Sequence, residues 1–337
     1  MVDLTSVQPL PEAGDWPETI PRLESGWRQT GGAVNPGLDE GLANWQAGEL
    51  AKRTRILRDR LDQLALKAAA VVTVGTQPGD YPTINAALAA LSERRPVYVV
   101  GGFTAEVRLR SGFIMREQVV VRGVNLGWIR ITSVDSEVQI DRSYLTTQIN
   151  TGNYPAFSAG GGGYLPIIDT LFAMTSAGTA AGRHGIYVYD GAGVTVSSGK
   201  GIKAAGGHGV LAQTSAVVAA NGADFRNALG VGAAMQGGTR GAFQAAILSG
   251  CDIGIQANNG ASVHAAEANC QSCVTGGIRA QSGATINALG ALARQVVSAD
   301  GTMDFSVAQG ATINAVGATG GTSVTPNTVT ASGIIFK

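Results

Sequence analysis

Four acidic residues in the C-terminal half of the chain could take part in cleaving a polysaccharide. That reaction needs two carboxylates, about 5 Å apart for retention of configuration or about 6.5 to 9.5 Å apart for inversion. Asp252 and Glu267 fall in successive sequence repeats, so this pair could lie close together. The same holds for Asp300 and Asp304, which share one connecting segment. The segment 182–337 contains no Trp and few aromatic side chains on which sugar rings could stack, so we expect these acids to be solvated turn residues.

Histidines are candidate metal ligands. His184 and His208 are 24 residues apart, and each directly precedes a Gly and a branched apolar residue, so we expect them to stack on neighbouring coils. Such a pair could bind a metal, but a hydrogen-bonded ladder or a turn position accounts for the spacing equally well.

The three cysteines are odd in number, which argues against a disulfide framework. Cys270 and Cys273 have CxxC spacing, Cys251 lies about one repeat earlier, and a fourth zinc ligand such as His264 is conceivable. No second CxxC occurs, and free cysteines commonly fill small buried sites. We therefore predict packing rather than zinc binding, with no metal and no cofactor.

A six-residue cassette that occurs three times, Gly-Ala-[Ser/Thr]-[Val/Ile]-[His/Asn]-Ala, indicates the elements that would position these side chains. The cassettes begin at positions 260, 283 and 310, at intervals of 23 and 27 residues. Such intervals suit one coil of a solenoid, in which each repeat buries its apolar face against its neighbours. The variable fifth position is predicted to form a polar stacking ladder: His264, Asn287 and Asn314.

A Gly followed by a branched apolar residue carries the same period upstream. These steps begin at Gly185, Gly209, Gly254 and Gly277, and Val231 falls near the middle of the longest interval. Short alternating runs separated by Gly and Asn are typical of strands rather than helices. We therefore predict a mainly β fold, a right-handed parallel β-helix with about 23 residues per coil, whose distal part covers 164–337 and ends in a closing rung.

Charge is concentrated in the N-terminal half, because only 15 of the 48 charged residues follow residue 157. The whole chain has 24 acidic and 24 basic residues, so no net charge draws it toward nucleic acid or a membrane. It has no apolar run long enough to span a bilayer and does not begin like a signal peptide. We expect no nucleic-acid partner, no membrane insertion and synthesis in the cytoplasm.

The N-terminal region divides into two predicted parts. Residues 1–40, rich in Pro, Gly and Trp, predict an extended attachment segment, or alternatively a disordered leader; the anchor candidates are Trp16, Trp27 and Trp45. Residues 41–72 have helical character and a heptad seam, which predicts a weak coiled-coil stalk or alternatively an amphipathic helix lying on the β-domain. The seam residues are Leu50, Thr54, Leu57, Leu61, Leu64, Ala68 and Val71.

Residues 73–159 are predicted to cap the solenoid. A helix is expected near 83–92 with Thr83 at its N-cap, followed by buried strands. A cap is physically required, because an open end of a β-helix exposes unpaired backbone groups. The four glycines at 160–163 are then expected to be a linker between the cap and the distal β-helix.

Three stretches carry a resemblance to known families. The Gly79–Ala87 helix with the strands Val97–Phe103 and Val119–Gly123 resembles the N-terminal cap of pectin-lyase-like β-helices. Asn44–Leu57 resembles the N-x(4–5)-L-A-x-R-T-x-x-L segment near the N-terminus of many phage and prophage tail fibre proteins. Asn327–Lys337 looks like the closing rung that such fibres often carry.

The resemblance implies a homotrimeric tail fibre or tailspike subunit located in the virion. Residues 1–72 would bind phage tail or baseplate proteins and supply a three-helix stalk, and the β-helix would bind a host surface glycan or outer-membrane component. The alternatives are a polysaccharide depolymerase, hydrolase or lyase, that uses the acids named above, and a structural baseplate component whose β-helix is a spacer. We favour the receptor-binding fibre without catalytic activity of its own.

Overall fold

The computed structural model describes residues 70–93, 105–176, 180–295 and 304–337, with residues 50 and 53–57 and two short strands, β1 (Ala65–Leu66) and β3 (Arg95–Pro96). The chain forms two compact units. One comprises Met1–Ala68 and Arg94–Val97, and the other comprises Ala69–Glu93 and Tyr98–Lys337. The predicted anchors Trp16, Trp27 and Trp45, and the seam residues Leu61, Leu64 and Ala68, lie outside the described residues.

The first unit contains a short helix and a strand pair. Residues 53–57 are helical, and the Thr54 hydroxyl donates a hydrogen bond to the carbonyl oxygen of Leu50 at 2.9 Å. Strand β1 pairs with β3 in parallel, so the backbone at 65–66 is extended where the heptad pattern predicts helix. Val71 also differs from the predicted helical seam, because it begins strand β2 (Val71–Val74), a β-branched run that suits a strand.

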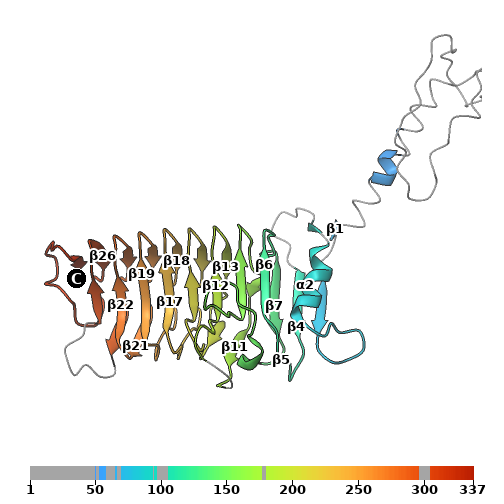
Figure 1. Ribbon diagram of the computed structural model, residues 1–337, viewed down its shortest axis with the longest axis horizontal. Coiled ribbons are helices and arrows are strands. Elements are labelled where there is room, and N and C mark those ends of the chain that lie inside the picture. Colours follow the sequence, from blue (N-terminus) through green and yellow to red (C-terminus); the bar gives the residue numbers. More distant parts are fainter. Residues whose placement is uncertain are drawn as a thin grey trace, which may run out of the picture. The chain divides into compact units, whose positions relative to one another are not determined.

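The second unit is a parallel β-solenoid of about nine turns. Its strands lie side by side along the solenoid axis (Figure 1), and every pairing between its strands is parallel. The eight-stranded sheet has the order β25-β22-β19-β17-β15-β12-β9-β6. Its strands are β6 (Val119–Arg122), β9 (Phe157–Gly160), β12 (Ile186–Val188), β15 (Val210–Ala212), β17 (Val231–Gln236), β19 (Ile253–Asn258), β22 (Gly276–Ala280) and β25 (Phe305–Val307).

The seven-stranded sheet forms a second side of the coils. Its strands are β13 (Gly193–Thr195), β16 (Val217–Ala219), β18 (Arg240–Ala242), β20 (Ser262–His264), β23 (Thr285–Asn287), β26 (Ala311–Asn314) and β27 (Gly333–Phe336). Isolated bridges from Tyr164 to Gly193 and from Ile168 to Val196 continue this side toward a four-stranded sheet. That sheet contains β10 (Ile167–Ile168), β7 (Ile129–Ser133), β4 (Ala105–Leu109) and β2.

The third side is less regular. It contains a four-stranded sheet of β14 (Gly201–Lys203), β11 (Leu171–Met174), β8 (Val138–Ile140) and β5 (Ile114–Met115), and a two-stranded sheet of β21 (Asn269–Cys273) and β24 (Leu292–Gln295). A 3-10 helix, η2, covers Arg142–Tyr144.

The cassettes form strands β20, β23 and β26, and their side chains alternate between core and solvent. In the first cassette Ala261, Val263 and Ala265 are buried, whereas Ser262 and His264 are exposed. Residue i pairs with the same cassette position in the next coil, as Val263 does with Ile286. The period-two pattern therefore assigns small apolar residues to the interior and polar residues to the outer surface.

A column of five glycines fixes the spacing at one corner: Gly185, Gly209, Gly232, Gly254 and Gly277. A Cβ atom on each would lie 2.5–2.7 Å from a carbonyl oxygen of the next coil. Side chains also fill the space, since a Cβ on Gly254 would lie 2.6 Å from Cys270 Sγ. Gly232 is the glycine of this column in its coil, and Ala233, which follows it, pairs with Ile255. Val231, which falls near the middle of the longest interval in the sequence, pairs with Ile253.

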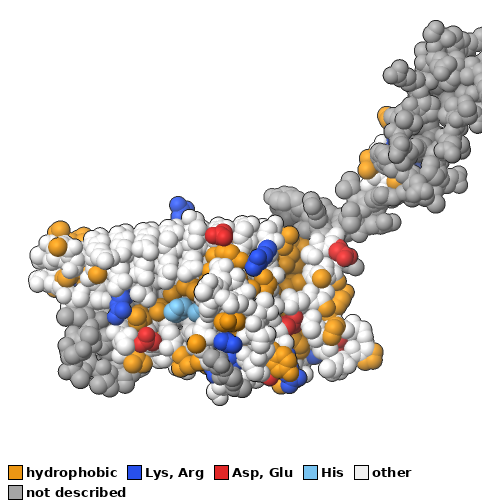
Figure 2. Space-filling model, in the orientation of Figure 1, with side chains coloured by type: hydrophobic (Ala, Val, Ile, Leu, Met, Phe, Trp, Pro, Cys, Tyr) orange, Lys and Arg blue, Asp and Glu red, His pale blue; other side chains and the backbone are white. Residues whose placement is uncertain are grey.

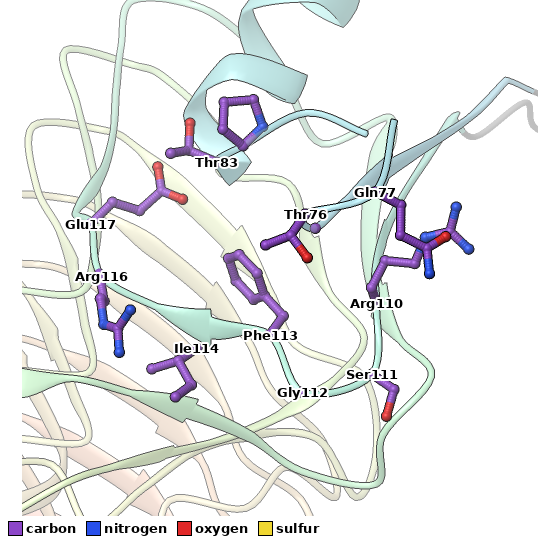
Figure 3. Close-up of a pocket in the computed structure, with 12 residues that line it drawn as sticks. Thr76, Gln77, Thr83, Arg110, Ser111, Gly112, Phe113, Ile114, Arg116 and Glu117 are labelled. Atoms are coloured by element: carbon purple, nitrogen blue, oxygen red, sulfur yellow. The ribbon is translucent and has the colours of Figure 1, made fainter. Parts of the chain in front are cut away.

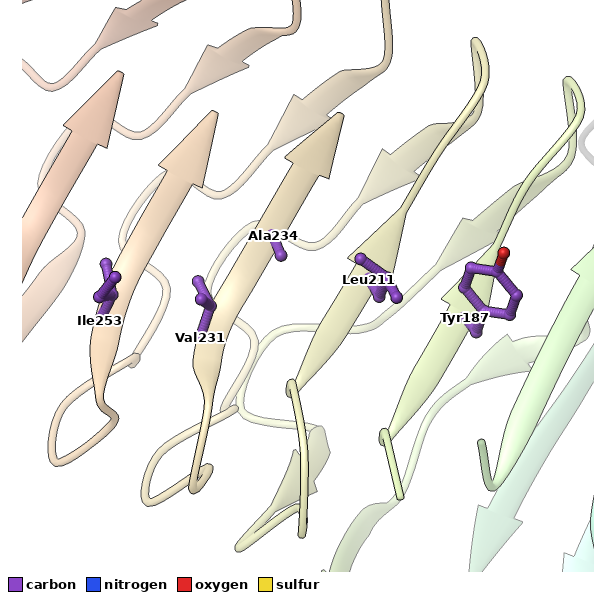
Figure 4. Packing of buried hydrophobic residues seen from close by; sticks show 5 residues of the cluster. All are labelled: Tyr187, Leu211, Val231, Ala234 and Ile253. Atoms are coloured by element: carbon purple, nitrogen blue, oxygen red, sulfur yellow. The ribbon is translucent and has the colours of Figure 1, made fainter. Parts of the chain in front are cut away.

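Besides the interior of the coils, a buried hydrophobic cluster lies on the outer side of the eight-stranded sheet (Figure 4). Tyr187 is in register with Leu211, and Leu211 with Ala234, at positions that alternate with the interior ones; Val231 and Ile253 complete the cluster. Ile149 and Tyr189 pack against it. The Tyr187 hydroxyl accepts a hydrogen bond from Asn150 Nδ2 at 2.6 Å and donates one to Gln213 Oε1 at 2.8 Å.

Helix α2 (Ile84–Ser92) lies where the sequence predicts a cap helix. The hydroxyl of its N-cap, Thr83, accepts a hydrogen bond from the backbone N–H of Ala86. Four apolar side chains are buried: Ile84, Ala87, Leu88 and Leu91. The helix contacts β2 and β4 and so covers the first coil.

The four glycines at 160–163 differ from the predicted linker. Gly160 is the last residue of β9, which pairs with β6 on one side and β12 on the other, so the solenoid continues through this segment. Gly161 and Gly162 have positive φ angles of 60° and 73°, which a tight turn requires and glycine adopts without strain. The segment is therefore a turn within a coil.

The C-terminal end of the solenoid is covered by its own chain. Strand β27 pairs with β26, and the backbone N–H of Asn327 donates to the carbonyl oxygen of Ile335 at 2.8 Å. The Asn327 side chain bonds both the N–H and the C=O of Lys337. These contacts satisfy backbone groups that an open strand edge would expose.

Candidate functional site

The predicted ladder residues come together on the outer side of the seven-stranded sheet. Asn287 Nδ2 donates a hydrogen bond to His264 Nδ1 at 3.1 Å, and Asn314 Nδ2 donates to Asn287 Oδ1, also at 3.1 Å. All three occupy one register column, which the parallel pairing of β20, β23 and β26 aligns. Each amide thus bonds its neighbour along the solenoid axis.

A second polar column runs beside the first. Ser262, Thr285 and Thr312 are in register on the same strands, two residues before the ladder residues. Arg240 precedes Ser262 in this column, and Ala242 precedes His264 in the other. Strand β27 ends the two columns with Ile334 and Phe336. We call this surface the ladder face, defined by the outward residues of β18, β20, β23, β26 and β27.

The ladder face forms an open groove of about 670 Å³. Its lining includes both polar columns of β20, β23 and β26, with the apolar side chains of Val316 and Phe336 at the C-terminal end. Phe336 is 42% exposed and offers a ring on which a sugar could stack. Hydroxyl, amide and imidazole groups beside an apolar ring are the groups with which proteins hold carbohydrate.

The sequence pattern indicated the ladder column but did not indicate Arg240 or Phe336. Arg240 belongs to a coil whose cassette is degenerate, Arg240-Gly241-Ala242, so it does not match the repeat. A glycine suits the inward position there because a Cβ atom on Gly241 would lie 2.6 Å from a Phe243 ring carbon. Phe336 lies in the final rung, where the cassette is also absent.

The described acidic candidates occupy separate places. Asp252 precedes β19 and accepts a hydrogen bond from the Thr275 hydroxyl at 2.8 Å. Glu267 is exposed in the turn between β20 and β21, so two sides of the coil separate it from Asp252 along the chain. Asp304 accepts a hydrogen bond from the backbone N–H of Gly321 at 2.7 Å. Asp300 lies outside the described residues.

The two histidines stack inside the solenoid wall. The ring centroids of His184 and His208 are 4.8 Å apart, and the rings are within 6° of parallel. His184 Nδ1 accepts the backbone N–H of His208, and His208 Nδ1 accepts the backbone N–H of Val231. Burial lowers the pKa of His184 to about 3, with a smaller contribution from His208. Both rings therefore act as neutral acceptors that join successive coils.

The three cysteines are buried thiols. Cys251 donates a weak hydrogen bond to the carbonyl oxygen of Phe225, and Cys273 donates one to that of Leu248, both at 3.4 Å. Burial raises the pKa of Cys251 to about 12 and that of Cys273 to about 11. In the part of the chain that the structure describes, no group of three His, Cys, Asp or Glu side chains could hold a metal ion.

A cavity of about 330 Å³ lies in the cap (Figure 3). Phe113 points into it, with Thr83 and Glu117 on one side and Gln77 and Arg110 on the other. Its charged groups already have partners within the chain. Both Glu117 oxygens accept backbone N–H bonds at the start of α2, and the Arg110 guanidinium bonds Asp80. The ladder face, whose donors are less fully used, is the better candidate for binding.

Neither a charged patch nor a membrane-spanning helix marks a further site in the views and residues described. The surface in Figure 2 carries scattered basic and acidic side chains without a broad patch of one sign. Among the described helices none has the length and apolar character needed to cross a bilayer.

No protein-family model matches the chain, and a comparison with curated proteins gives no match. The class that the fold defines is that of parallel β-solenoid proteins.

Proposed function

We propose that this protein is a tail fibre or tailspike subunit of a phage virion that binds the host cell surface through the ladder face. The observation that carries the proposal is the groove in which His264, Asn287 and Asn314 form a hydrogen-bonded column beside a hydroxyl column and an exposed aromatic ring. Such a surface suits a host glycan or an outer-membrane component. The resemblance of Asn44–Leu57 to tail fibre segments supports the assignment to a virion.

The proposed assembly is a homotrimer held by an N-terminal helical stalk. Leu50 and Leu57 support it, because these seam side chains are 56% and 47% exposed in the single chain. Apolar side chains at heptad positions gain free energy when a second helix covers them. Residues 1–72 would dock on tail or baseplate proteins, and the pectin-lyase-like, right-handed solenoid would extend toward the host.

Binding without catalysis is the activity that the geometry favours. Polysaccharide hydrolysis needs two facing carboxylates beside a groove. The described carboxylates Asp252, Glu267 and Asp304 are not among the residues that line the ladder-face groove.

Adhesion to bacteria tests the proposal. Fluorescently labelled full-length protein is incubated with a panel of bacterial strains, and bound fluorescence is compared for the wild type, Asn287→Ala and Gln256→Ala. Asn287→Ala removes the centre of the ladder, whereas Gln256→Ala removes an amide on the outer side of the eight-stranded sheet. We expect adhesion to at least one strain, reduced only by Asn287→Ala.

Other outcomes favour the alternatives. Failure to adhere to any strain would favour a structural baseplate component. New reducing ends or unsaturated products released from capsule or lipopolysaccharide would identify a depolymerase. Adhesion that is equally strong in both variants would show that another surface binds the host.

A further inference from the structure

The hydrogen-bond direction and charge of the ladder face indicate the chemistry of its ligand. We propose that the ladder face binds an acidic polysaccharide, one whose sugars carry carboxylate groups. This inference rests on the proposed function, in which the ladder face is the host-binding surface.

The ladder uses its acceptors internally and leaves donors free. Neutral imidazole has one N–H, and because His264 Nδ1 accepts the Asn287 bond, the proton is on Nε2. Each amide of Asn287 and Asn314 uses one N–H along the column and keeps a second. The amide oxygens are also used: Asn287 Oδ1 accepts from Asn314 Nδ2, and Asn314 Oδ1 accepts from the backbone N–H of Val316. The column therefore offers mainly N–H groups to a ligand.

Arg240 adds a positive charge at the end of the hydroxyl column. It is exposed, and its outward neighbours in register are Val217 and Ser262. Within the described residues its guanidinium has no hydrogen bond and no ion pair, unlike Arg226, which is held by Asp224, and Lys203, which is held by Glu137. A planar guanidinium with free N–H groups matches the two oxygens of a carboxylate.

No carboxylate opposes this charge among the outward residues of β16, β18, β20, β23, β26 and β27. These residues are Val217, Ala219, Arg240, Ala242, Ser262, His264, Thr285, Asn287, Thr312, Asn314, Ile334 and Phe336. A ligand rich in negatively charged acceptors complements such a face, whereas a ligand with many donors would leave the ladder's N–H groups unpaired.

Binding to carboxylated polysaccharides and their reduced forms tests the inference. The probes are polygalacturonate, alginate and polysialate, each compared with the same polymer after its carboxyl groups are reduced to alcohols. We expect full-length protein to bind at least one acidic polymer at least tenfold more tightly than its reduced form. Binding to that polymer should weaken as salt is raised.

Substitution of Arg240 tests whether its charge contributes to binding of the acidic polymer at the ladder face. Arg240→Gln should weaken binding to the acidic polymer about fivefold, the size expected for one exposed ion pair, and should leave binding to the reduced polymer unchanged. The matched control is Arg279→Gln, on the outer side of the eight-stranded sheet. It should bind like the wild type.

The possible outcomes distinguish failure of this inference from failure of the proposed function on which it rests. If no acidic polymer binds more tightly than its reduced partner, or if Arg240→Gln and Arg279→Gln have equal effects, the acidic-ligand proposal is wrong. The proposed function survives that result as long as Asn287→Ala still lowers adhesion to bacteria. If Asn287→Ala leaves adhesion unchanged, the ladder face is not the host-binding surface and both proposals for it fail.

Discussion

The backbone N–H of His208 donates a hydrogen bond to Nδ1 of His184, 2.9 Å away, while the two imidazole rings stack face to face. His184 Nε2 lies 2.9 Å from Asn153 Oδ1, which completes the polar contacts of that ring. The pair thus joins three segments of adjacent coils through neutral imidazole. Protonation of His184 Nδ1 would replace the acceptor by a donor and break the contact.

The stability of the solenoid should therefore fall as pH is lowered. The pKa of His184 is about 3 in the folded protein and about 6.5 when unfolded, so the unfolded state binds more protons between these values. The stabilisation is complete above about pH 6.5 and is lost progressively down to about pH 3, by on the order of a few kcal/mol. The titratable neighbour of His184 is His208, whose own pKa is also lowered by burial. The charge of Asp252 opposes the shift of the His208 pKa.

Thermal unfolding between pH 7.5 and pH 4 measures the effect. His184→Gln should flatten the dependence of Tm on pH relative to the wild type. Equal slopes in the two proteins would contradict the role assigned to His184.

The glycine column should not tolerate a side chain. A Cβ atom on Gly277 would lie 2.6 Å from Ala293 Cβ and 2.7 Å from the carbonyl oxygen of Asp304. Gly277→Ala should lower the free energy of unfolding by about 1–3 kcal/mol. The neighbouring Gly276→Ala is the control, because its Cβ would have no neighbour closer than 3.6 Å, and it should change stability by less than about 1 kcal/mol. Denaturant titration measures both, and equal losses would contradict the packing argument.

The cap helix should depend on its N-cap. Thr83→Ala removes the hydroxyl that accepts the Ala86 N–H bond and should cost about 1 kcal/mol. Thr76→Ala, at another position lining the cap cavity, should be close to neutral. Hydrogen exchange of the amides in α2 measures local opening directly. Faster exchange in Thr76→Ala than in Thr83→Ala would refute the assignment.

The three thiols should resist modification in the folded protein. Burial is the main cause that raises the pKa of each thiol above its ordinary value, so the reactive thiolate is scarce at pH 8. We expect no reaction with a disulfide reagent in native buffer and three equivalents of reaction in denaturant. Rapid labelling of the native protein would show that one of these positions opens to solvent.

The stalk proposal makes a prediction about mass. Light scattering of full-length protein at micromolar concentration should give three times the 34.3 kDa of one chain. A Leu50→Glu and Leu57→Glu double variant should be monomeric, because charge at seam positions opposes helix association. Arg55→Glu, on the same helix but outside the seam, should remain trimeric. A monomeric wild-type protein would refute the assembly.

The sequence pattern predicted the solenoid well where residue types repeat. The Ala and branched residues of the cassettes alternate with Ser, Thr, His and Asn, so both the buried and the exposed columns follow from period two. The helix at Ile84–Ser92 was also predictable, from its N-cap threonine and its apolar spacing.

Other features depend on contacts that the pattern does not contain. The sequence places Val231 near the middle of the longest interval but does not show that Gly232 belongs to the glycine column. Only the pairing of β17 with β19, which places Gly232 beside Gly254, fixes the register of this coil. The four glycines at 160–163 have the composition of a linker, and only the pairing of β9 on both sides shows a turn. Arg240 is placed on the ladder face only by the register of strand pairing, which aligns it with Ser262.

The in-register stacking of coils has a consequence for how this protein can evolve. Ser262 pairs with Thr285, so residues 262–284 form a module whose removal or duplication would rejoin the chain at equivalent positions. Recombination within the gene can therefore change the number of coils in a single event. Point substitutions at outward positions change the outer surface separately, because they leave the buried alanine, valine and isoleucine columns untouched. The number of coils and the chemistry of the outer surface can therefore change independently of each other.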